Sequence, residues 1–165
     1  MNIEKIIKNV EEVVTIEDLK SLEGRNDLKG YIGFEPSGLV HLGTGLICGN
    51  KVKDLIESGI DMTILLADWH AFINDKFGGD MEKIRVAAEI MKQSFIAIGV
   101  PESIHFVYAD EMVDSKKYWE KIIRVAKNTT LSRVRRAMDI MGRKGNDMDL
   151  DSSKIIYPFM QVTDI

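Results

Sequence analysis

Met62-Thr63-Ile64-Leu65-Leu66-Ala67 is a nearly continuous apolar run in the middle of the chain. Such a run is typical of a strand in a parallel sheet that is covered on both faces. Two further short strands are predicted at 29–34 and 104–108. Helical periodicity separates the three strands, at 43–58 and at 80–98. This alternation of strand and helix predicts an α/β fold with a doubly wound parallel sheet.

The remaining parts of the chain are predicted to be mostly helical. Amphipathic patterns suggest helices over 2–13, a short one after Thr15, and then 114–127, 129–143 and 152–163, with a polar loop at 145–151. Three strands are few for a Rossmann-like sheet, and the last helical pattern reaches Ile165 without a cap. We therefore expect one incomplete domain with extra helices at its C-terminal end.

The composition is that of an ordinary globular protein, with 45% apolar and 29% charged residues. Cys48 is the only cysteine, which excludes a disulfide scaffold and favours a reducing compartment. The net charge of −4 gives no general support for nucleic-acid binding, although a local basic patch remains open. We find neither a membrane-length apolar run nor a signal peptide, so we expect a cytoplasmic protein without a membrane partner.

A glycine-rich turn follows the first strand, within residues 31–44. Ligands of open α/β sheets bind beyond the carboxyl ends of the strands, and a helix N-terminus there favours an anion. Gly33 leaves room for a ligand against the strand, and Gly43 allows the helix to approach a phosphate. Ser37 and His41 can add hydrogen-bond donors. From the glycines alone, a phosphate-binding loop and a plain strand–helix turn are equally open.

A polar stripe is predicted on the last helix. Tyr157, Gln161 and Asp164 are spaced i, i+4 and i+7, which places them on one helical face. The residues around them are strongly apolar, which favours a stripe that faces a pocket, with a solvated face as the alternative. Strand alternation places Tyr31 and Glu35 on the same side of the first strand as the glycine between them.

Together these segments resemble the signatures of the tyrosyl-tRNA synthetases of archaeal and eukaryotic type, which are class I aminoacyl-tRNA synthetases. The matching segments are Tyr-Ile-Gly-Phe-Glu-Pro-Ser-Gly followed by His-Leu-Gly (31–43), Leu-Leu-Ala-Asp-Trp-His-Ala (65–71) and Tyr-Pro-x-Met-Gln-x-x-Asp (157–164). The resemblance runs from about residue 30 to the end and corresponds to the N-terminal part of the catalytic domain. It implies ATP-dependent conversion of L-tyrosine to tyrosyl-adenylate and transfer to tRNA(Tyr).

The resemblance also implies roles for individual residues. The catalytic residues would be His41 and Thr44. The tyrosine-binding residues would be Tyr31, Glu35, Tyr157, Gln161 and Asp164. The ATP-binding residues would be Gly33, Ser37, His41, Gly43 and Thr44. ATP would arrive with Mg²⁺ held mainly through phosphates and water, with no dedicated metal ligand in the chain. The resemblance further implies a homodimer.

It also implies a division of residues 1–165 into N-terminal helices (1–28), a β-α-β nucleotide-binding core (29–108), and a helical insertion with the substrate-binding helix (109–165). The basic cluster that includes Arg133 and Arg136 would contact the tRNA acceptor end, with a solvated helix face as the alternative. We interpret His70 as a pocket wall at a strand end, and Trp119 beside Tyr118 as packing or interface.

The chain departs from the family pattern in two ways. Thr44 stands where the usual signature has its second histidine, although a hydroxyl can still donate to a phosphate. The Lys-Met-Ser-Lys-Ser loop does not occur within the 165 residues, so we expect these residues alone to be inactive or weakly active.

Three alternatives stay open. They are a tryptophanyl-tRNA synthetase, a small nucleotidylyltransferase with a related signature, and a non-catalytic RNA- or protein-binding paralogue. Tyr31 with Asp164 favours a phenol over an indole, and a nucleotidylyltransferase would not need the polar stripe. The paralogue remains open because of Thr44 and the short chain.

Overall fold

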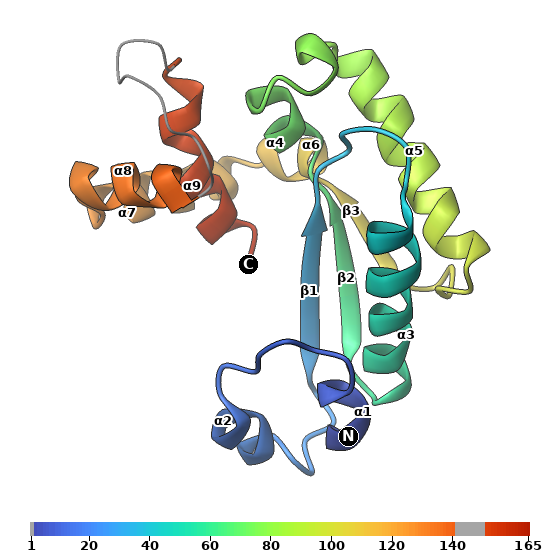
Figure 1. Cartoon of the computed structure of the whole chain (residues 1–165). Helices are drawn as coiled ribbons and strands as arrows, with labels where there is room; N and C mark the ends of the chain where they lie inside the picture. Colours follow the sequence, from blue (N-terminus) through green and yellow to red (C-terminus); the bar gives the residue numbers. More distant parts are fainter. Residues whose placement is uncertain (1, 141–150) are drawn as a thin grey trace.

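The computed structural model describes residues 2–140 and 151–165 (Figure 1). Its sheet has three parallel strands in the order β1-β2-β3, which are β1 (Lys29–Phe34), β2 (Asp61–Leu66) and β3 (His105–Tyr108). The crossover from β1 to β2 contains a π-helical turn, η1 (Gly43–Cys48), and α3 (Gly49–Glu57). The crossover from β2 to β3 contains α4 (Asp68–Ile73), η2 (Lys76–Gly79) and α5 (Met81–Ala97). The predicted α/β fold with a parallel sheet is confirmed.

The core lies where α3 and α5 cover one face of the sheet (Figure 1). Val52 of α3, Ile64 and Leu66 of β2, and Phe95 of α5 are fully buried together. Leu65 points to the other face and is 1% exposed in a separate apolar cluster. The central strand is therefore buried on both faces, as its continuous apolar run predicts.

The N-terminal segment folds into α1 (Ile3–Ile7) and α2 (Ile16–Ser21). The prediction of one helix over 2–13 is wrong, because the helix ends at Ile7. Lys8 is extended and Asn9 has a positive φ of 57°, which an α-helix does not allow. The ammonium group of Lys51 donates to the carbonyl oxygen of Ile6 at 3.1 Å. This contact from α3 satisfies a carbonyl that a longer helix would have bonded itself.

The C-terminal part is helical, with α6 (Ala109–Val113), α7 (Lys116–Lys127), α8 (Leu131–Ile140) and α9 (Ser153–Thr163). The helices predicted over 114–127 and 152–163 are confirmed to within two residues. The end of the helix predicted over 129–143, and all of the loop predicted at 145–151 except Asp151, lie outside the described residues. Neither α4 nor α6 was predicted, because five or six residues hold too few turns for a periodic pattern.

Helices α7 and α9 pack against α4 through a second apolar cluster. Tyr118 and Ile122 of α7 meet Tyr157 and Met160 of α9, together with Ile73 of α4. In Figure 1, α7 and α9 lie beside the carboxyl end of β1, away from α3 and α5. This packing brings the polar stripe of α9 toward the face of the sheet opposite α3 and α5. No helix in the described residues is long and apolar enough to cross a membrane.

Candidate active site

A cavity of about 340 Å³ lies between α9 and the face of the sheet opposite α3 and α5, at the carboxyl end of β1. All five residues predicted to bind tyrosine line it. The complete lining is Tyr31, Gly33, Glu35, Leu65, Ala67, His70, Tyr157, Gln161, Asp164 and Ile165. The shared strand face predicted for Tyr31, Gly33 and Glu35 is confirmed, and the stripe on α9 faces a cavity.

One wall of the cavity is built around the carboxylate of Glu35. The Tyr157 hydroxyl of α9 and the Asn74 amide after α4 both donate to Glu35 Oε1. The Lys76 ammonium lies 4.0 Å from Glu35 Oε2. Two distant segments, α9 and the stretch 74–76 after α4, therefore hold this carboxylate at the end of β1. Asn74 was not singled out from the sequence, since it stands 39 positions from Glu35 with no motif around it.

The opposite wall is built around the carboxylate of Asp164, whose side chain is 2% exposed. The Tyr118 hydroxyl donates to Asp164 Oδ1 at 2.7 Å. His70 Nε2 lies 2.9 Å from Asp164 Oδ2, outside the alignment of a hydrogen bond. Burial, and then the bond to Asp164, raise the pKa of Tyr118 well above its usual range. Tyr118 is therefore a neutral hydrogen-bond donor at any physiological pH.

Tyr31 stands at the mouth of the cavity and is 39% exposed. Burial of part of its ring, and the charge of Asp164, raise the pKa of Tyr31 to about 12. A methyl group at Gly33 would lie 2.8 Å from the Tyr31 hydroxyl, closer than real contacts of this kind. The room that Gly33 leaves against the strand is thus occupied by the Tyr31 hydroxyl.

The segment predicted to bind ATP lies outside the cavity, apart from Gly33. His41 is exposed, and its Nδ1 accepts a hydrogen bond from the Gly43 amide at 3.2 Å. His41 Nε2 lies 3.3 Å from the Thr44 hydroxyl. Because Nδ1 accepts, the proton of a neutral ring is on Nε2, which then donates to Thr44. Ser37 is exposed in the loop that precedes this group.

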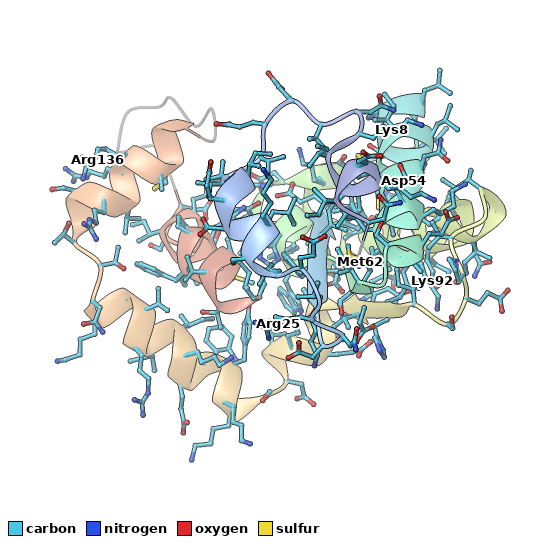
Figure 2. All side chains as sticks on the ribbon, turned by 90° about the horizontal axis from the view of Figure 1, so that it is seen from below. Lys8, Arg25, Asp54, Met62, Lys92 and Arg136 are labelled. Atoms are coloured by element: carbon cyan, nitrogen blue, oxygen red, sulfur yellow. The ribbon has the colours of Figure 1, made fainter. Side chains whose placement is uncertain are left out.

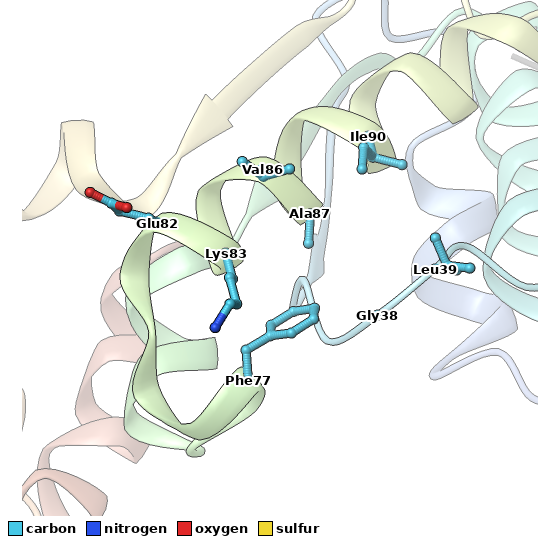
Figure 3. A pocket seen from close by; sticks show the side chains of 8 residues that line it. All are labelled: Gly38, Leu39, Phe77, Glu82, Lys83, Val86, Ala87 and Ile90. Atoms are coloured by element: carbon cyan, nitrogen blue, oxygen red, sulfur yellow. The ribbon is translucent and has the colours of Figure 1, made fainter.

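A second, larger hollow of about 410 Å³ lies between the 38–39 loop and the outer side of α5 (Figure 3). It is lined mainly by apolar side chains, together with Glu82 and Lys83. The Lys83 ammonium is paired with Asp80 at 2.7 Å. None of the predicted site residues lines this hollow, so the structure separates it from the candidate active site.

Comparison with known proteins agrees with this arrangement. A family profile described as "tRNA synthetases class I (W and Y)" matches residues 23–165. The chain belongs to this class I synthetase family. Within it, the chain is similar to the archaeal tyrosyl-tRNA synthetases. It is 51% identical over 164 residues to the tyrosine–tRNA ligase of Picrophilus torridus, covering 99% of this chain and 49% of that protein.

Solved structures of archaeal tyrosyl-tRNA synthetases share the fold. The enzyme from Aeropyrum pernix superposes with a TM-score of 0.89 at 50% identity, over 98% of this chain and 48% of that one. The enzyme from Pyrococcus horikoshii, solved with L-tyrosine, superposes with a TM-score of 0.86 at 45% identity. This match covers 100% of this chain and 47% of that one. The chain thus spans about half the length of the synthetases it matches, in the N-terminal catalytic part.

The two arginines predicted to contact tRNA lie on α8 of this synthetase chain. Arg133 and Arg136 are exposed, and neither lines the cavity. Figure 2 shows Arg136 at one extremity of the molecule, with Lys92 at the other. The remaining basic residues of the predicted cluster, Arg143 and Lys144, lie outside the described residues.

His70 lines the cavity, as its interpretation as a pocket wall predicts. Its ring also meets the Tyr157 ring edge to face, with 5.1 Å between their centroids. Tyr118 is the functional candidate that sequence reasoning missed. It packs in the α7–α9 cluster, and its hydroxyl also donates a hydrogen bond to Asp164. No local signal points to this contact, because the two residues are 46 positions apart.

Proposed function

We propose that the chain carries the tyrosine-binding half and the His-x-Gly segment of a tyrosine–tRNA ligase. The whole protein would activate L-tyrosine with ATP and transfer the tyrosyl group to tRNA(Tyr). The observation that carries this proposal is the cavity itself, which is closed at one side by buried Asp164 and at the other by the Glu35–Tyr157 pair. An amino acid with a polar ring substituent has one polar group for each of these walls. Its ammonium group matches the Glu35–Tyr157 pair, and its ring substituent matches Asp164.

In this proposal, Asp164 and Tyr31 bind the phenol hydroxyl of the substrate. Asp164 accepts a hydrogen bond from the substrate hydroxyl, and the protonated Tyr31 hydroxyl is available as a partner at physiological pH. Tyr157 and Gln161 hold the α-ammonium group, and the Glu35 carboxylate adds an opposite charge at that end. The amino acid would lie with its carboxylate directed toward the segment that holds ATP.

His41, Thr44, Ser37 and the backbone near Gly43 are proposed to bind the phosphates of ATP. The substrate carboxylate attacks the α-phosphorus, an α-phosphorus–oxygen bond forms, and the bond to the pyrophosphate oxygen breaks. A carboxylate nucleophile needs no base, so these groups act by positioning and by donating to developing charge. Mg²⁺ would neutralise phosphate charge. Among the described residues, no group of three His, Cys, Asp or Glu side chains could hold a metal ion.

Three further parts of the proposal concern the whole protein. Arg133 and Arg136 would contact the tRNA acceptor end, and their charge reversal should flatten the salt dependence of tRNA binding. A homodimer is supported by an apolar hollow of about 230 Å³ at which Phe72, Trp119 and Ile156 are exposed. The domain division into 1–28, 29–108 and 109–165 is part of the same proposal. A tRNA substrate would place the protein in the cytoplasm.

The test is calorimetric titration of the chain with non-hydrolysable analogues of tyrosyl-, tryptophanyl- and phenylalanyl-adenylate. Selective binding of the tyrosyl analogue supports the proposal. Equal binding of all three, or preference for the tryptophanyl analogue, overturns it. In pyrophosphate exchange we expect the 165 residues alone to be inactive or weak, and a rate near that of an intact synthetase would contradict that part.

A further inference from the structure

The side chain of Asp164 is held by helices other than its own. Asp164 caps the C-terminal end of α9, where its backbone amide donates to the Met160 carbonyl at 2.9 Å. The carboxylate instead accepts a hydrogen bond from Tyr118 of α7, at 2.7 Å from Oδ1, and His70 Nε2 of α4 lies 2.9 Å from Oδ2 without the alignment of a hydrogen bond. Both carboxylate oxygens thus have a neighbour supplied by a distant part of the chain.

The two neighbours stand in different relations to the cavity. His70 is among the residues that line it, whereas Tyr118 is not. Tyr118 is 5% exposed and lies in the apolar cluster between α7 and α9. Each carboxylate oxygen has two lone pairs, so an oxygen that accepts from Tyr118 can still accept from a ligand.

We propose that Tyr118, with His70 on the second oxygen, is a positioning residue that aims the Asp164 carboxylate at a ligand hydroxyl. The proposal rests on the proposed function and extends it to Tyr118, which does not line the cavity. A carboxylate fixed in this orientation selects ring substituents that donate a hydrogen bond. A phenyl ring or a methyl ether offers no such donor and leaves the carboxylate without a partner at the cavity surface.

A purely structural role for Tyr118 makes a different prediction. If its hydroxyl only joined α7 to α9, its removal would weaken binding of tyrosyl and phenylalanyl ligands by the same factor. If it aims Asp164, its removal weakens only the ligand that carries the hydroxyl. The ratio of the two affinities therefore separates the two roles.

The experiment compares Tyr118→Phe with the matched control Tyr108→Phe in the full chain. The Tyr108 hydroxyl also donates to a carboxylate, that of Glu89 at 2.6 Å, but it lies outside the cavity. Calorimetry with the tyrosyl- and phenylalanyl-adenylate analogues gives the affinity ratio for each variant. Tyr118→Phe is expected to lower the ratio about 10-fold, as for the loss of one hydrogen bond to a charged group. Tyr108→Phe should leave it unchanged.

A second pair of variants keeps the test informative if Tyr118→Phe does not fold, which circular dichroism would reveal. His70→Gln keeps a polar side chain beside Asp164 Oδ2, whereas His70→Leu places an apolar one there, so the glutamine variant should retain more selectivity. An unchanged ratio in Tyr118→Phe, an equal loss for both ligands, or equal selectivity in the two His70 variants would overturn the inference. An unmodified chain without selectivity would instead overturn the proposed function itself.

Discussion

The tyrosine cavity and the His41 segment differ in how their side chains are held. The cavity is lined by residues of β1, β2, α4 and α9. The carboxylate of Asp164 is almost completely buried in it and accepts a hydrogen bond from α7. The groups around His41 are exposed, and the hydrogen bonds of the His41 ring reach no further than Thr44, three positions along the chain.

This difference indicates that the two half-sites depend on different parts of the protein. A side chain that is fixed by several distant elements already has its bound geometry before a ligand arrives. Ligand binding therefore loses little free energy to the ordering of such side chains. A segment held by contacts within four residues leaves most of its donors in water. We therefore infer that the amino-acid cavity is preorganised in this chain, whereas tight nucleotide binding needs further groups.

The largest expected effect comes from Asp164→Ala. This change removes the buried acceptor and leaves the Tyr118 hydroxyl without the bond that it makes here. We expect binding of the tyrosyl-adenylate analogue to fall about 100-fold, from the loss of charge-assisted bonds. Calorimetry measures this affinity, and the control is Asp114→Ala, which removes an exposed carboxylate. An equal loss of affinity in Asp164→Ala and Asp114→Ala would contradict the account of the cavity as a preorganised site.

A smaller effect is expected from His41→Ala, which removes the ring that organises the exposed segment. Binding of the adenylate analogue should fall about 10-fold, because one hydrogen-bond donor and its positioning are lost. Binding of L-tyrosine alone should stay unchanged, since His41 does not line the cavity. A parallel loss of L-tyrosine affinity would show that the two regions are not separable.

Gly33→Ala is expected to act on the cavity through Tyr31. The added methyl group would lie 2.8 Å from the Tyr31 hydroxyl, so the half-exposed ring has to swing aside. L-tyrosine affinity should drop several-fold, about the effect of one weakened neutral hydrogen bond. The melting temperature should hardly change. Affinity equal to that of the unmodified chain would show that Tyr31 does not take part in binding.

The smallest effect concerns stability at high pH. The folded chain raises the pKa of Tyr31 from 10.0 to about 12, so the folded state holds this proton more tightly than the unfolded state does. Its contribution to stability is complete below pH 10 and is lost as the pH rises from 10 to 12. Urea unfolding across this pH range should show that the free energy of unfolding falls less steeply with pH in Tyr31→Phe than in the unmodified chain. Identical slopes for the two proteins would contradict the assignment.

Regular patterns in the sequence predicted the parts of the molecule that local chemistry determines. The apolar run of β2 and the polar stripe of α9 each follow from one periodicity, and both proved correct. The end of α1 was missed because it depends on Lys51, more than 40 positions away. The same reason hid Tyr118 and Asn74, whose partners are fixed by tertiary packing and carry no local motif.

The most direct measurement is the binding of L-tyrosine to the chain in the absence of ATP, by calorimetry, beside L-phenylalanine and L-tryptophan. A preorganised cavity predicts saturable binding of L-tyrosine, with the other two amino acids at least about 10-fold weaker. L-phenylalanine offers Asp164 no ring donor, and the indole N–H of L-tryptophan lies on a larger ring and at a different position from a phenol hydroxyl. Binding that requires ATP, or equal binding of the three amino acids, would contradict the account.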